Sequence, residues 1–114
     1  MLRAEIWLID LSPTLGAEMQ KTRPAVIVND DEVGILPLRV IVPITNWKDR
    51  YAQAPWMVRL EPSPENGLSK SSTADAFQVR SVSQQRFVSR LGGSSPENLD
   101  AVGKALKRVL KLHP

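Results

Sequence analysis

The sequence has no cysteine and one histidine, and both scarcities exclude whole classes of functional site. Without cysteine there are no disulfides and no thiolate metal sites, which suits a reducing cytoplasm. The histidine, His113, stands one residue from the end, so neither paired imidazoles nor a histidine-rich metal site is expected. The sequence therefore predicts no metal and no cofactor, and its chemistry must come from Arg, Lys, Thr, Ser, Gln and carboxylates.

Long apolar runs and phosphate-binding loops are also missing. No stretch approaches the ~20 apolar residues of a membrane span. The first ten residues, MLRAEIWLID, lack the layout of a signal peptide and favour a strand. No glycine-rich loop of the P-loop or dinucleotide type occurs. We therefore expect a cytoplasmic protein with no membrane partner and, at 114 residues, a single domain over 1–114.

The net charge of +3 is confined to one end of the chain. Four of the fifteen basic residues follow residue 100, where there is no acid, so residues 1–100 hold eleven basic and twelve acidic groups. Basic side chains near the end of a helix favour its dipole. The basic balance therefore indicates a solvated helix face and says little about nucleic acid.

Short segments rich in β-branched residues alternate with turn-forming residues over about the first 90 positions. Pro43 lies inside one of these segments and predicts a bulge or an edge position there. Six short strands of this kind predict a small, strongly bent antiparallel sheet or barrel. The predicted strands are Glu5–Ile9, Ala25–Val28, Leu38–Ile44, Trp56–Leu60, Phe77–Val82 and Arg86–Leu91.

The last twenty residues follow a different pattern, that of one helix. Ser95-Pro96-Glu97 supplies a capping hydroxyl, a proline for the first helical position and an acid in the first turn. Apolar residues then recur at helical spacing, with basic residues opposite, which predicts an amphipathic helix on the sheet. The apolar residues are Leu99, Val102, Leu106, Val109 and Leu110.

A polar loop stands directly before the second predicted strand. Arg23 ends this loop, and because the residue before a proline is held extended, its guanidinium projects from a defined backbone position. A planar fork of donors suits a phosphate. The alternative is a strand-end arginine paired with an acid, and this feature alone leaves both open.

Two further polar spots fall on predicted strands. Thr45 and Asn46 end the third strand, where hydroxyls commonly satisfy a turn. Alternation places Gln78 and Arg80 on one face of the fifth strand, opposite Phe77 and its alternate neighbours. Trp47 and Trp56 are candidates either for stacking on bases or for partly buried core.

Taken in order, these stretches resemble the MazF/PemK family of toxin endoribonucleases. The stretch EIWLIDLSPTLGAEMQKTRPAVIVND is similar to the family's opening strand, polar loop and Arg-Pro strand. RVIVPITN is similar to its next strand, which ends in a threonine, and FQVRSVSQQRFV with LGGSSPENLDAVGKAL resembles its closing strands and helix. One departure is Phe77, where many members carry an acid before the glutamine, and Asp75 cannot be assumed to replace it.

The resemblance implies a mainly β fold with a C-terminal helix, an SH3-like small barrel, in a homodimer inhibited by a cognate antitoxin. It implies sequence-selective, metal-independent cleavage of single-stranded mRNA to 2′,3′-cyclic phosphate and 5′-hydroxyl ends. The implied catalytic pair is Arg23 and Thr45, with Glu18 either a general base or a group that positions RNA. The implied RNA-binding residues are Glu18, Gln20, Lys21, Asn46, Gln78 and Arg80.

Two other functions are compatible with a small barrel. A non-enzymatic toxin resembling the CcdB group would bind gyrase and would not need Arg23 and Thr45 to converge. An inactive SH3-like domain would serve only for interaction. Incubation with unstructured RNA in EDTA separates a nuclease from both.

Overall fold

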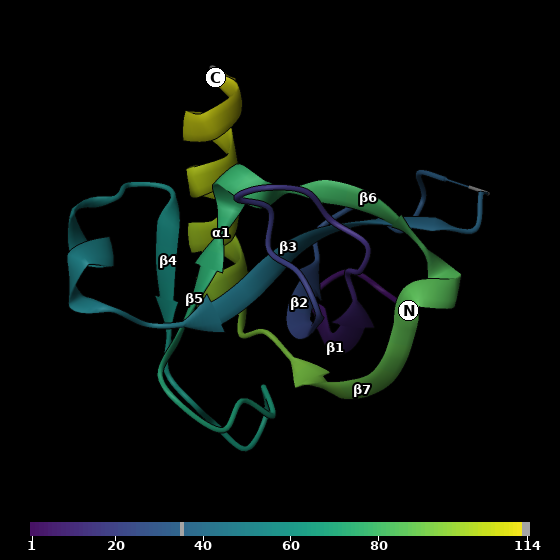
Figure 1. Ribbon diagram of the computed structural model, residues 1–114, viewed down its shortest axis with the longest axis horizontal. Helices are drawn as coiled ribbons and strands as arrows, with labels where there is room; N and C mark the ends of the chain where they lie inside the picture. Colours follow the sequence, from purple (N-terminus) through teal and green to yellow (C-terminus); the bar gives the residue numbers. More distant parts are fainter. Residues whose placement is uncertain (35, 113–114) are drawn as a thin grey trace.

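The computed structural model describes residues 1–34 and 36–112, so His113 lies outside the described residues. In this part of the chain, seven strands, three 3-10 segments and one α-helix follow one another (Figure 1). The strands are β1 (Glu5–Asp10), β2 (Thr22–Ile27), β3 (Leu38–Asn46), β4 (Met57–Leu60), β5 (Ser72–Asp75), β6 (Arg80–Ser83) and β7 (Phe87–Gly93). The helical segments are η1 (Asp49–Gln53), η2 (Ala76–Gln78), η3 (Gln84–Arg86) and α1 (Pro96–Leu110).

The strands form one antiparallel sheet in the order β4-β5-β3-β2-β1-β7, and β6 also pairs with β3. β7 curves around one side of the molecule, and its pairing with β1 contains two register shifts (Figure 1). Within the described residues, β6 and β7 share no ladder, so hydrogen bonds do not close the bent sheet. The mainly β fold with a C-terminal helix is confirmed, and the bent sheet is consistent with a small barrel.

β3 is the central strand and has neighbours along both edges. Residues 41–43 pair with β2, while on the other edge residues 38–41 pair with β6 and 44–46 with β5. The expected bulge at Pro43 is not seen in its register with β2, which is continuous, but one edge of β3 is unpaired at this residue, as an edge position requires. Pro43 lies between the stretches paired with β6 and β5, where a missing N–H removes no bond of those two ladders.

The predicted strand Phe77–Val82 is only partly correct. Its first residues form η2, and an additional strand, β5, precedes them. The Asp75 carboxylate accepts a hydrogen bond from the Phe77 N–H at 3.1 Å, so the chain turns where the ladder was expected to begin. β5 reads Ser-Thr-Ala-Asp and lacks apolar alternation, although all four residues are buried.

Two apolar clusters occupy opposite faces of the sheet, as the alternation along β2 and β3 dictates. The first contains Val26 and Val42 and is covered by α1 through Val102. The second contains Ala25, Ile27 and Ile41 from the other face.

α1 begins as predicted, because the Ser95 hydroxyl accepts a hydrogen bond from the Asn98 N–H at 3.1 Å. Leu99 and Leu106 pack against the first cluster. Leu110 does not, since it is 53% exposed, whereas Val109 beside it is half-buried, so the predicted apolar face ends at Val109. In the described residues, no helix is long and apolar enough to cross a membrane.

Candidate active site

Arg23 is held at the start of β2 by its own backbone and by the preceding loop. Pro24 follows it, and the pairing of Ile9 with Arg23 fixes the strand against β1. The Arg23 side chain is half-buried, and its Nε donates to the Gln20 carbonyl oxygen at 3.2 Å. Among the described residues, Arg23 forms no ion pair within 4 Å. It is therefore not the strand-end arginine paired with an acid that the sequence left open as the alternative.

Thr45 faces Arg23 from the end of β3. Ala25 pairs with Pro43, so continuing that register by two residues places Arg23 opposite Thr45. The Arg23 Nη1 atom lies 3.4 Å from the Thr45 hydroxyl oxygen, at the long limit of a hydrogen bond. The predicted pair is therefore brought together by strand register, and a weak contact leaves both groups available to a ligand.

A cleft of about 480 Å³ opens beside this pair. Its polar wall contains Asn46, which was predicted, and also Ser69 and Lys70, which were not. Hydroxyls, an amide and two cationic side chains surrounding a partly apolar floor suit a phosphodiester. The full lining is Leu8, Arg23, Pro24, Ile44, Thr45, Asn46, Gly67, Leu68, Ser69, Lys70, Ser72 and Leu91.

The segment around Gly67 forms the far wall of the cleft and is packed tightly on β7. A Cβ added to Gly67, whose φ is +68°, would lie 2.0 Å from the Leu91 carbonyl oxygen, and one added to Gly92 would lie 2.2 Å from the Glu65 oxygen. The Gly93 N–H also donates to the Glu65 oxygen at 2.8 Å. This close approach of two backbones fixes where Ser69 and Lys70 stand.

The loop between β1 and β2 is anchored at its neck. The Leu11 N–H donates to the Lys21 carbonyl oxygen at 3.0 Å, and the Lys21 N–H donates to the Ser12 hydroxyl at 3.2 Å. Arg86 donates to the carbonyl oxygens of Asp10 and Ser12. The loop therefore leaves and returns at fixed points beside Arg23.

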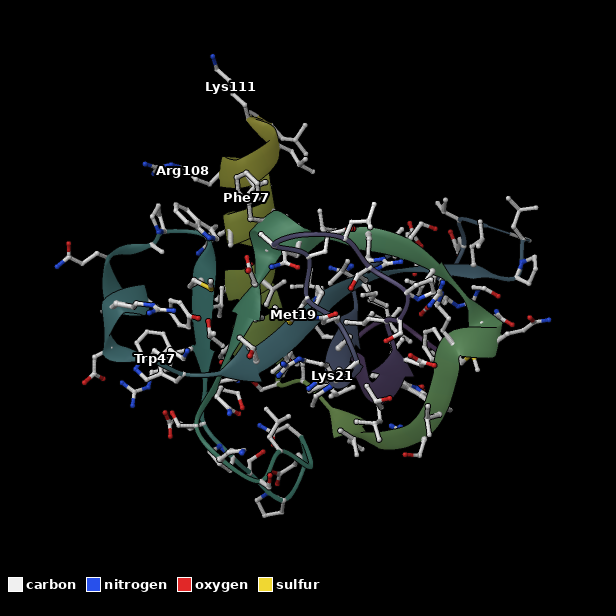
Figure 2. All side chains as sticks on the ribbon, in the orientation of Figure 1. Met19, Lys21, Trp47, Phe77, Arg108 and Lys111 are labelled. Carbon is white, nitrogen blue, oxygen red and sulfur yellow. The ribbon has the colours of Figure 1, made fainter. Side chains whose placement is uncertain are left out.

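The middle of the loop is anchored by Met19 and Gln78. Met19 packs against the second apolar cluster, and Figure 2 shows it over β3. Its N–H donates to the Gln78 Oε1 atom at 2.5 Å. Gln78 Nε2 donates to Asp75 Oδ2 at 3.3 Å and lies 3.5 Å from the Ala17 carbonyl oxygen. The amide of Gln78, which was predicted to bind RNA, thus forms hydrogen bonds that hold the loop in place.

A second cavity of about 480 Å³ lies between this loop and η2. Glu18, Gln78 and Arg80 line it, together with Phe77, Val79, Pro43, Ala17 and Met19. The expectation that Gln78 and Arg80 oppose Phe77 and Val79 is wrong, because η2 breaks the two-residue alternation. Four of the six predicted RNA-binding residues are therefore divided between two cavities, with Asn46 in the first and the other three in the second.

The remaining loop residues contribute in different ways. Gln20 and Lys21 are exposed, and Gln20 reaches Arg23 only through its backbone oxygen. The Glu18 carboxylate accepts a hydrogen bond from the Leu15 N–H at 2.7 Å and lines the second cavity rather than the cleft at Arg23. In this arrangement Glu18 does not meet Arg23 and Thr45.

Asp75 is a structural acid, 6% exposed. Burial raises the pKa of its carboxyl, and hydrogen bonds from Phe77 and Gln78 oppose that rise without cancelling it. This carboxylate accepts hydrogen bonds within η2 and is absent from both cavity linings. It therefore does not replace the acid that many family members carry at the position of Phe77.

The two tryptophans considered for base stacking are both half-buried. Trp47 packs edge-on against Tyr51, and the Arg59 guanidinium lies 4.8 Å from its ring centre. Trp56 packs edge-on against Phe77, with ring centres 5.9 Å apart. Trp47 is therefore occupied within the protein, whereas Trp56 supports the exposed ring of Phe77.

Residues 2–110 match the family model described as PemK-like, MazF-like toxin of type II toxin–antitoxin system. Since the match spans almost the whole sequence, the chain belongs to this toxin family. It is 34% identical to endoribonuclease MazF9 of Mycobacterium tuberculosis, over 98% of both chains.

Two solved structures share the fold. MazF from Deinococcus radiodurans aligns with a TM-score of 0.82 and 21% identity, over 98% of this chain and 97% of that one. An endoribonuclease in complex with its cognate antitoxin, from Mycobacterial species, aligns with a TM-score of 0.78 and 20% identity, over 100% and 98%. The recognised resemblance and the fold class are thereby confirmed.

Proposed function

We propose that this chain is a toxin endoribonuclease that cleaves single-stranded mRNA sequence-selectively and without a metal. The observation that carries the proposal is the Arg23 guanidinium, 3.4 Å from the Thr45 hydroxyl in an open cleft and in no ion pair among the described residues. The family of the chain and a full-length relative named an endoribonuclease support the same reaction.

The reaction uses the nucleophile that RNA itself carries. The 2′-hydroxyl oxygen forms a bond to the adjacent phosphorus, the bond from phosphorus to the 5′-oxygen breaks, and a 2′,3′-cyclic phosphate remains. Negative charge grows on the phosphoryl oxygens, and donors held in place for that charge are often the largest catalytic contribution. Arg23 supplies the fork, and the Thr45 hydroxyl donates to a second phosphoryl oxygen.

Two protons must also move. Arg23 protonates the departing 5′-oxygen, because an alkoxide is basic enough to take a proton from a guanidinium. The lining of the cleft contains no carboxylate and no imidazole among the described residues. The proton of the 2′-hydroxyl therefore passes to water, and Glu18 positions RNA from the neighbouring cavity.

Assembly and location complete the proposal. The protein acts as a homodimer in the cytoplasm, and a cognate antitoxin inhibits it by covering the cationic cleft. The complex of a structural neighbour with its antitoxin supports the second partner, and exposed apolar side chains such as Leu110 and Leu112 leave surface for both. The apparent mass in solution should be near twice 12.7 kDa.

The gyrase-binding alternative is not favoured, because the family match and the named relatives are those of MazF-like toxins and endoribonucleases. Incubation of the purified protein with a long unstructured RNA in excess EDTA tests the proposal. Discrete fragments with 2′,3′-cyclic phosphate and 5′-hydroxyl ends are expected. Fragments with 5′-phosphates would contradict the mechanism, and intact RNA together with stalled gyrase would support the alternative.

A further inference from the structure

Phe77 is an aromatic side chain left largely in solvent beside the proposed active site. It is 65% exposed, and Figure 2 shows it projecting from η2 in front of α1. Its backbone is held by the hydrogen bond from its N–H to Asp75, and its ring packs edge-on against Trp56. The ring is thus packed on one side against Trp56 and has a free face on the other.

The cavity beside Phe77 has the composition of a site for one flat, polar-edged ring. Met19, Val79 and Pro43 supply apolar walls, and Glu18 and Arg80 supply charged groups. The amide of Gln78 is committed to the loop and to Asp75. Arg80 forms no ion pair within 4 Å among the described residues, so its donors are available to acceptors on a base.

This cavity and the Arg23 cleft are both lined by residues of β3. Pro43 lines the second cavity and Thr45 lines the first, and two residues along a strand are about 7 Å apart on one side. The loop that supplies Ala17 and Met19 also supplies the carbonyl oxygen that holds Arg23. A strand of RNA with a phosphate at Thr45 would carry a neighbouring base to Phe77.

We propose that Phe77 and Arg80 form a subsite that receives one unpaired RNA base flanking the scissile phosphate. The base stacks on the Phe77 ring, as unpaired bases do on aromatic side chains. Arg80 donates to acceptors on its edge and thereby sets the base preference at that position. This inference rests on the proposed function, and it names the specificity determinants of the same site.

The test compares three variants at Phe77 with a control. Phe77→Ala removes the ring, Phe77→Leu keeps apolar bulk without it, and Phe77→Tyr keeps the ring. Val88→Ala, also an exposed apolar position but on β7, is the control. Each protein is given a pool of short RNAs with randomised positions, and base frequencies around every cut are read by sequencing. Binding is measured separately with the DNA version of the pool, which lacks the attacking hydroxyl.

In Phe77→Ala and Phe77→Leu, base preference should vanish at one position and persist at the others. Their KM for a preferred RNA should rise about 5- to 150-fold, with kcat less affected. Phe77→Tyr and Val88→Ala should resemble the unmodified protein, and Arg80→Gln should change which base is preferred at the same position.

Different results would contradict the subsite and the proposed function. Cutting by Phe77→Ala with every base preference intact would overturn the subsite and leave the nuclease standing. Loss of dimerisation or antitoxin binding alone would likewise assign Phe77 to a protein interface and overturn the subsite. An unmodified protein that neither cuts the RNA pool nor binds its DNA version would overturn the proposed function itself.

Discussion

The guanidinium of Arg23 lies 3.4 Å from the hydroxyl of Thr45 because the start of β2 lies opposite the end of the antiparallel strand β3. Neither residue needs the other for stability at that distance, and neither is buried enough to require a partner. The pair is therefore positioned by the sheet and left free for substrate, which is how a rigid scaffold best holds catalytic groups.

Gln78→Ala should loosen the loop between β1 and β2. It removes the acceptor of the half-buried Met19 N–H, at a cost of about 1 kcal/mol. We expect a lower free energy of unfolding and faster hydrogen exchange at Met19. Gln85→Ala, at an exposed position, is the control. Unchanged exchange at Met19 would show that Gln78 does not hold the loop.

Asp75→Asn should change how stability depends on pH. The pKa of Asp75 is raised above its usual 3.8, so the folded state binds this proton more tightly than the unfolded state does. The stabilisation that this tighter proton binding gives to the folded state is fully present below pH 3.8 and is lost as pH rises through the raised pKa of Asp75. Chemical denaturation across this range should show that loss in the unmodified protein, and a flatter profile in Asp75→Asn. Parallel profiles would contradict the assignment.

Gly92→Ala should disturb the wall of the cleft. Its new methyl group would meet backbone at 2.2 Å, which cannot yield cheaply, so we expect a loss of about 1–3 kcal/mol. Gly103→Ala in α1 meets nothing within 4 Å and should instead stabilise by about 0.5–1 kcal/mol. Thermal unfolding of both variants measures the contrast, and equal shifts would refute the tight packing.

Lys70→Ala should weaken RNA binding through one phosphate contact. The logarithm of the affinity should then fall less steeply with the logarithm of salt concentration, by about 0.7 for one contact to a single strand. Lys107→Ala is the control, because Lys107 lies on the exposed face of α1. Titrations at several salt concentrations test this, and identical slopes for both variants would remove Lys70 from the interface.

The sequence predicted the parts of the fold that depend on local patterns. β-branched runs marked most strands, and Ser95-Pro96 marked the start of α1, because caps and alternation act over a few residues. β5 was not predicted, because three of its four residues are polar although all four are buried in the fold. η2 escaped because the carboxylate of Asp75 competes with the ladder, which alternation does not reveal.

The candidate site was predictable in part for the same reason. Local patterns mark the strand ends at which Arg23 and Thr45 stand, but it is the family resemblance that implies them as the catalytic pair. Ser69 and Lys70 enter the cleft because Gly67 and Gly92 contact backbone that is distant in the sequence, which no local pattern reveals. Phe77 stood out in the sequence as a departure, but its exposed face is a property of the structure.

The most direct test of the central claim is single-turnover cleavage by Arg23→Ala, measured beside direct RNA binding. Loss of one preorganised donor should slow cleavage by about 100- to 1,000-fold, while affinity changes far less. Arg23→Lys should recover little, because an ammonium lacks the fork. Thr45→Val, which keeps the shape and removes the hydroxyl, should also cut slowly in a folded protein. A folded Arg23→Ala protein that cleaves RNA at nearly the unmodified rate would contradict the account.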